Sequence, residues 1–271
     1  MTRVRTFIGL VLIAAYLFPI YWMVTASFKT QADIRAVPPQ LVPLHPDLST
    51  WRERIFADPR VLRYVTNSVI VATGTMLVTV LLAAPAAYAL ARYRLRGRSV
   101  VLFFCLSSLM FPAIMLATPL FVIFNRLGLT DGYLGLVLAD TTLALPYAIV
   151  LLRPTFAKIP LEYTEAALID GCSPVRAFVS VVLPLARPGL ATVAVLSFLW
   201  GWGDLVFALT LVNEDARRPV TTGLWAFFGA NTSDWGGAMA FSTLAMLPPL
   251  VIFLLSQRLV ITGVGAGGLK G

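Results

Sequence analysis

Six long apolar segments, separated by polar or charged loops, constrain the fold of this chain more than any other feature. Each segment is long enough to cross the hydrocarbon core of a bilayer, which takes about 20 residues of helix. Backbone polar groups inside a membrane need partners within the segment, so the segments are expected to be helices. The predicted spans are residues 6–27, 68–91, 99–124, 133–152, 188–212 and 238–261. The sequence therefore predicts an all-α membrane protein with six transmembrane helices in one domain, residues 1–271.

The composition supports a lipid partner and argues against nucleic acid. Apolar residues make up 58% of the chain and charged residues only 13%, which is more apolar and less charged than a soluble domain. The formal charge of +8 comes from short basic clusters between the apolar segments. Such clusters are typical of membrane topology signals. We therefore predict no nucleic-acid partner.

The distribution of Lys and Arg predicts that both termini are cytoplasmic. With the N-terminus inside, the inner segments carry 12 of these residues and the outer segments carry 9, six of them in the long first loop, residues 28–67. Short loops determine orientation more strongly than long ones, and without the long loop the ratio is 12 to 3. The polar loop 153–187 is thereby predicted to lie in the cytoplasm.

This cytoplasmic loop has the pattern of two short helices joined by a turn. Pro160 suits a first helical position, because its missing N–H needs no partner there. Gly171 suits the left-handed residue that ends a helix, and Ser173–Pro174 provides a cap and a first-turn proline for the next one. The second helix is not expected to pass Pro184 undisturbed. From the pattern alone, the pair is either a docking surface or a hairpin that only joins two spans.

Two carboxylates, Asp140 and Asp204, fall inside predicted spans. An acid in a span is a candidate for substrate contact or proton relay; the alternative is a place near a helix end or beside a polar packing partner. Gly201 and Gly203 could unwind the helix before Asp204 and open a cavity. Trp202 could stack on a sugar ring, although packing is the commoner role of such an aromatic residue. The candidate pathway residues are therefore Asp140, Trp202 and Asp204.

The chain has no motif for ATP hydrolysis or nucleophilic catalysis. The phosphate-binding pattern G-x-x-x-x-G-K-[ST] does not occur. The single histidine, His45, lies in a predicted outer loop, so neither a Ser/His/Asp set nor a metal site is expected. We therefore expect neither enzymatic activity nor a bound cofactor in this chain itself. A membrane subunit without an energy source of its own needs a docking surface for a partner that supplies one. The cytoplasmic helical pair would provide that surface.

The cytoplasmic pattern resembles the EAA signature of bacterial ABC-importer permeases, which lies between the fourth and fifth of six spans. Its residues here are Glu165, Ala166, Ala167, Asp170, Gly171, Leu183, Pro184 and Pro188. Further stretches are similar to the carbohydrate subgroup, above all to the shorter permease of maltose-type importers: residues 27–29, 67–68, 85–92, 127–129 and 267–271. One stretch departs from the family. Relatives read Trp-Asn-Glu where this chain has Trp202-Gly203-Asp204, so the acid is one methylene shorter and the amide is absent.

The resemblance implies the type I ABC-importer permease fold in the inner membrane of a bacterium. An extracytoplasmic binding protein or lipoprotein would deliver a sugar, expected to be a di- or oligosaccharide, to a pathway formed with a second homologous permease. A dimer of ATP-binding subunits, holding ATP and Mg, would receive the helix around Glu165–Gly171 as the coupling helix. Glu165 would pair with a basic group of that partner.

Other functions stay open on the sequence alone. The same machinery could import glycerol-3-phosphate or a polyol, although few Lys or Arg residues lie within the spans to bind a phosphate. An ion-coupled secondary transporter using Asp140 and Asp204 belongs to a different class, and the lack of a visible internal repeat argues against it. A membrane scaffold without transport activity is the third alternative.

Overall fold

A computed structural model describes residues 2–228 and 234–265, and within these ranges the chain forms helices and no β-strand. Residues 1–65 with 222–248 form one compact unit, and residues 66–221 with 249–271 form another. Each unit is described by itself. That the chain forms a single permease domain stays a prediction.

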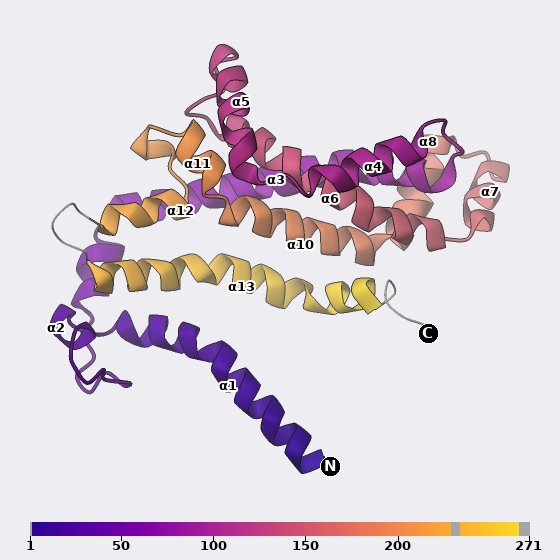
Figure 1. The fold of residues 1–271 in the computed structure, drawn as a ribbon. Helices are drawn as coiled ribbons and strands as arrows, with labels where there is room; N and C mark the ends of the chain where they lie inside the picture. The colour runs from indigo at the N-terminus through magenta and orange to yellow at the C-terminus, as the bar shows by residue number, and fades with distance from the viewer. Residues whose placement is uncertain (1, 229–233, 266–271) are drawn as a thin grey trace. The chain divides into compact units, whose positions relative to one another are not determined.

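Four helices are each long and apolar enough to cross a membrane (Figure 1). They are α1 (Thr2–Ala26), α3 (Pro59–Arg92), α6 (Tyr133–Lys158) and α13 (Trp235–Gly265). They correspond to the first, second, fourth and sixth predicted spans. α3 begins before the predicted residue 68, because Pro59 fits a first helical turn and no breaker follows it. α6 likewise runs beyond the predicted residue 152.

The third predicted span is a bent pair of helices. α4 (Arg98–Ser108) and α5 (Ala113–Arg126) meet at 103°. Two prolines, Pro112 and Pro119, lie within the predicted span 99–124. The chain breaks before Pro112, which has an extended ψ of 135°, whereas Pro119 lies inside α5. Counted as one span each, this pair and the one described next bring the number of candidate spans among the described residues to six.

The second bent pair surrounds Pro184. In chain order it consists of α8 (Pro174–Ala177), the π-helical turn η2 (Phe178–Val182), α9 (Leu183–Leu185) and α10 (Arg187–Gly203). The N–H of Leu183 donates to the carbonyl of Phe178, five residues earlier, so a wider turn precedes the proline that lacks an N–H. The chain then bends by 81° before α10. The prediction that Pro184 disturbs this helix is confirmed.

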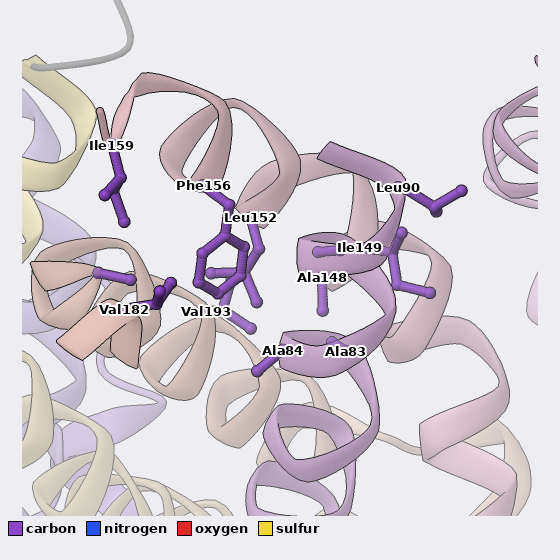
Figure 2. Close-up of a cluster of buried hydrophobic side chains, with 12 residues drawn as sticks. Ala83, Ala84, Leu90, Ala148, Ile149, Leu152, Phe156, Ile159, Val182 and Val193 are labelled. Carbon is purple, nitrogen blue, oxygen red and sulfur yellow. The ribbon is translucent and has the colours of Figure 1, made fainter. Parts of the chain in front are cut away.

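Small residues bring the helices of the second unit together. One buried apolar cluster joins α3, α6, η2 and α10 (Figure 2). Figure 2 shows Leu152 and Phe156 of α6 lying beside Val182 and Val193, with Ala83 and Ala84 of α3 nearby. Alanines permit such close contact between helices, as the sequence of residues 83–87 predicted. A second cluster joins α3, α5, α6 and α11 through Val71, Phe124, Leu136, Val137, Phe207 and other residues.

The first unit orders the long polar segment that follows α1. The indole N–H of Trp51 donates to the hydroxyl of Ser27 at 3.2 Å, and its ring stacks on Phe28. Lys29 is buried, with its ammonium 4.3 Å from the centre of the Trp22 ring.

The shorter elements of the chain are α2 (Gln31–Ile34), η1 (Thr50–Phe56), α7 (Leu161–Ile169), α11 (Val206–Leu211), η3 (Asp215–Arg217), α12 (Val220–Gly223) and η4 (Leu224–Phe227).

Candidate coupling segment and intramembrane polar site

The predicted cytoplasmic helical pair is present as α7 and α8. Pro160 has an extended ψ of 140° and precedes α7 as its N-cap. The prediction of a first helical position for Pro160 was therefore wrong by one residue, because this ψ lies outside the helical range. Ser173 caps α8 by accepting a hydrogen bond from the N–H of Arg176, and Pro174 follows in the first turn. This second cap is as predicted.

Gly171 ends α7 in the left-handed conformation, with φ of +85°. Its N–H donates to the carbonyl of Leu168 at 3.1 Å, and the N–H of Cys172 donates to the carbonyl of Ala167 at 3.0 Å. These bonds satisfy carbonyls that the end of a helix leaves free. A Cβ at Gly171 would meet no atom within 4 Å, so the requirement for glycine comes from the backbone and not from space.

The α7–α8 pair presents an apolar surface. Ile169 and Val175 are 85% and 72% exposed, and Leu168 is 43% exposed. Of the signature residues, Ala167 faces inward and is buried, whereas Glu165, Ala166, Asp170 and Gly171 are exposed and Pro184 is half-buried. The structure thus divides the signature into one packing residue and an exposed set.

Contacts with α3 hold the chain where it enters α7. The guanidinium of Arg92, the last residue of α3, donates to the carbonyl of Ile159. The ring of Tyr88 packs against Phe156 and Phe178, with centroids 5.7 and 4.8 Å away. Sequence analysis gave Arg92 no role of its own. Arg92 directly follows the predicted span 68–91, which was the signal that could have separated it from the other arginines.

Asp204 lies at a break in the fifth predicted span. α10 ends at Gly203, and the Asp204 carboxylate accepts hydrogen bonds from the N–H groups of Phe207 at 3.2 Å and Ala208 at 2.8 Å. The side chain therefore caps the first turn of α11, where free N–H groups favour an anion. The unwinding predicted next to the glycines is confirmed. The alternative reading of Asp204, a place near a helix end, is also confirmed.

The two glycines before the break have different roles. A Cβ at Gly201 would lie 3.1 Å from the Cα of Ala72 and 3.0 Å from the hydroxyl of Thr75, so Gly201 permits a close approach of α10 to α3. A Cβ at Gly203 would meet nothing within 4 Å. Between them, Trp202 is buried and stacks on Phe198 with a centroid distance of 5.7 Å. This is the packing role that the sequence left as the commoner alternative.

Asp140 is fully buried in α6. Among the described residues, neither carboxylate oxygen of Asp140 has a hydrogen-bond partner, and the same is true of the hydroxyls of Thr75 and Thr79 in α3. Two side chains act on the Asp140 carboxyl: Asp204 through its charge, and the Thr75 hydroxyl as a hydrogen-bonding neighbour outside the geometry of a formed bond. The two predicted acids thus lie within electrostatic range of each other, and sequence reasoning missed Thr75 and, one turn further along α3, the buried Thr79.

Asp131 ties two loops of the second unit together. Its φ is +56°, its N–H donates to the carbonyl of Leu211, and its carboxylate accepts from the N–H groups of Asn213 and Glu214 at 2.5 and 2.9 Å. These backbone donors hold the pKa of Asp131 below its usual value. Sequence reasoning placed Asp131 in a loop but gave it no role.

Asn67 and Ser68, near the predicted start of the second span, contact the loop that follows α11. The Asn67 amide donates to the carbonyls of Ala216 and Arg218, and the Ser68 hydroxyl accepts from the N–H of Val220 at 2.8 Å. This pair resembled the carbohydrate-importer family in sequence. Its structural role is to hold a loop.

These features define a polytopic membrane protein of the transport class: apolar helices with broken spans, an intramembrane acid and an exposed helical pair between two spans. Residues 60–265 match the family described as binding-protein-dependent transport system inner membrane component. The match covers most of the chain, and the chain belongs to this family. It is a multi-pass subunit of the inner membrane and a transport component of a system that uses a binding protein.

Several curated relatives are similar over nearly their whole length. The trehalose/maltose transport system permease protein of Thermococcus litoralis is 33% identical, covering 99% of this chain and 97% of that protein. The sulfoquinovosyl glycerol transport system permease protein of Agrobacterium fabrum is 33% identical, with 96% and 91% covered. The trehalose transport system permease protein of Mycobacterium tuberculosis is 34% identical, with 94% and 93% covered.

A solved structure confirms the ABC-importer permease fold. It is a chain of a bacterial ABC transporter involved in the import of the acidic polysaccharide alginate, with a TM-score of 0.81. The alignment covers 94% of this chain and 96% of that chain at 23% sequence identity. At this identity the likeness concerns the fold.

Proposed function

We propose that this chain is one of the two permease subunits of an ATP-driven importer for a di- or oligosaccharide or a glycoside. Relatives named for trehalose, maltose and sulfoquinovosyl glycerol support a sugar substrate. The chain would form the pathway with a second homologous permease. In this proposal it has six spans, with both termini in the cytoplasm.

The observation that carries the proposal is the exposed apolar surface of α7 and α8. Ile169 and Val175 are largely exposed on a segment whose ends are fixed by caps and by the contact between Arg92 and Ile159. Apolar side chains gathered on a rigid aqueous-facing segment mark a surface for another protein. We assign this surface to an ATP-binding subunit, which would hold ATP and Mg. The chain itself would bind no cofactor.

The packing around the segment supports a mechanical role. Phe156 and Phe178 lie on either side of α7 in the chain, and both contact Tyr88 of α3. Because a close-packed cluster is stiff, a displacement of α7 by the closing ATP-binding subunits would move the ends of α3 and α6 and the turn η2 together. The exposed Glu165 would make a charge pair with a basic group of the ATP-binding subunit.

The pathway residues remain those proposed from the sequence, with roles refined by their burial. Asp204 is half-buried and follows the open position Gly203, which supports a place at the wall of the pathway. Trp202 and Asp140 are buried within this subunit. They would shape the wall from behind and would not touch the sugar directly.

The test uses the complete transporter, reconstituted with its binding protein. Glu165→Lys should abolish ATP-dependent sugar uptake and weaken co-purification of the ATP-binding subunits, because it reverses the charge on the proposed docking face. Glu162→Lys is the matched control, since Glu162 is an exposed acid on the same helix outside the signature, and uptake should be retained. Equal uptake and co-purification in both variants would contradict the docking assignment. Uptake driven by a proton or sodium gradient without ATP would contradict the class.

A further inference from the structure

The polar residues beside Asp140 form a set that the proposed sugar pathway does not explain. Asp140, Thr75 and Thr79 are each 0% exposed, so no sugar reaches them in this conformation. The side-chain oxygens of all three lack a hydrogen-bond partner among the described residues. A buried polar group without a partner is costly and points to an unseen ligand or to a functional role.

The two threonines differ from four other threonines of the helices. Thr141, Thr192, Thr210 and Thr243 each donate to the carbonyl four residues earlier in their own helix. This is the usual way in which a helix satisfies a buried hydroxyl. Thr75 and Thr79, spaced four residues apart on one face of α3, make no such bond. Their oxygens are left for a group other than their own helix.

The surroundings of this set are negative. α10 ends at Gly203, and the free carbonyls at the C-terminal end of a helix carry partial negative charge. Asp204 adds a carboxylate that acts on Asp140. No ion pair involves Asp140 in the described part of the chain. Near this end of α10, Gly201 lies against the Thr75 hydroxyl. The N–H groups of α11 cap the Asp204 carboxylate, so Asp140 is the acid of the set that no N–H group or cation balances among the described residues.

We propose that Asp140, the hydroxyls of Thr75 and Thr79 and the C-terminal end of α10 bind a small monovalent cation, Na⁺, that holds α3, α6 and α10 together. Carboxylate, hydroxyl and carbonyl oxygens are ligands for hard cations, and the ends of broken membrane helices coordinate Na⁺ in other transporters. A divalent ion is disfavoured, because it takes more carboxylates and the Asp204 oxygens already accept from α11. The site does not depend on which solute the protein transports.

The test measures thermal unfolding of the purified transporter complex in NaCl, KCl and choline chloride at equal ionic strength. In the wild type, NaCl should raise Tm by about 5 °C at 100 times the dissociation constant, relative to choline chloride. Asp140→Asn, which keeps the shape but removes the charge, should abolish the NaCl effect, and Thr75→Val should weaken it. Asp131→Asn is the control, because this acid lies in a loop outside the set, and its NaCl response should equal that of the wild type.

Two results would overturn the proposal. One is a wild-type Tm that is the same in NaCl and choline chloride, which would mean that a proton neutralises Asp140. The other is an Asp140→Asn variant that still responds to NaCl. An equal rise in NaCl and KCl would likewise count against a site shaped for Na⁺. Because sugar uptake is not measured, failure here leaves the proposed transport function untouched, and failure of uptake assays leaves this site untouched.

Discussion

Replacing Gly171 by alanine should uncouple the transporter without removing any contact. Gly171 has φ of +85° and open space around the position of a Cβ. A non-glycine residue in the left-handed conformation costs about 1–2 kcal/mol. That cost lowers the population of the capped end of α7 relative to frayed conformations by a factor of about 5–30. We expect ATP-dependent uptake to fall by up to this factor.

The chain provides a matched control in Gly97. Gly97 also has φ of +85°, its Cβ would also meet nothing within 4 Å, and it lies in the turn between α3 and α4. Gly97→Ala therefore introduces the same backbone strain outside the proposed docking surface. Gly171→Asn serves as the rescue variant, because asparagine tolerates the left-handed conformation better than alanine does.

The assay compares the three variants in proteoliposomes, with sugar uptake and ATP hydrolysis measured on the same samples. Gly171→Ala should lower uptake per ATP hydrolysed, Gly171→Asn should restore most of it, and Gly97→Ala should match the wild type. The reasoning is refuted if both alanine variants lose uptake equally, because the effect would then be general strain. It is also refuted if Gly171→Ala transports and hydrolyses ATP like the wild type.

Three further predictions follow from local geometry. Gly201→Ala should lower Tm, since overpacking against α3 costs about 1–3 kcal/mol, whereas Gly203→Ala should leave Tm unchanged; thermal unfolding in detergent compares the two. The lowered pKa of Asp131 means that its carboxylate stabilises the loops before α6 and after α11 above its unfolded-state pKa. This contribution is lost as the pH falls below about 4 towards the folded-state pKa. Limited proteolysis with an acid-stable protease should therefore show that these loops open below that pH in the wild type. In the Asp131→Asn variant the loops should be equally open at all pH values. Arg92→Ala should expose the chain near Ile159, seen as faster labelling of a cysteine placed there, and a labelling rate like that of the wild type would argue against the tether.

Local signals explain which features could be predicted from the sequence. The turn at Gly171 and the cap at Ser173 follow from the preferences of single residues for φ and for helix ends. The long helices follow from the lengths of apolar segments, which a bilayer sets within a few residues. The EAA spacing combined both kinds of signal, so the two helices between the fourth and fifth predicted spans were located in the sequence with an error of one residue at Pro160.

Long-range partners explain what could not be predicted. The chain breaks before Pro112, with a bend of 103° between α4 and α5, whereas Pro119 lies inside α5, so a proline alone does not determine which outcome occurs. Asp204 looked like a residue facing a cavity, but its carboxylate caps α11 just beyond the break. Thr75, which acts on Asp140, lies on α3 far away in the sequence, and nothing in the spacing of the two residues indicates that they are neighbours.

The bend before α10 makes that helix a lever. Just beyond the bend, a Cβ at Gly189 would lie 2.6 Å from the hydroxyl of Thr155. The backbone of α10 therefore packs directly against a side chain of α6, and this contact is the point about which α10 would rotate. From Gly189 to Gly203, the last residue of α10, the helix rises about 21 Å at 1.5 Å per residue. A rotation of about 10° about Gly189 would carry Gly203 about 4 Å sideways. A small tilt of α10 imposed near Pro184 would thus produce a larger displacement at Gly203, where this helix ends.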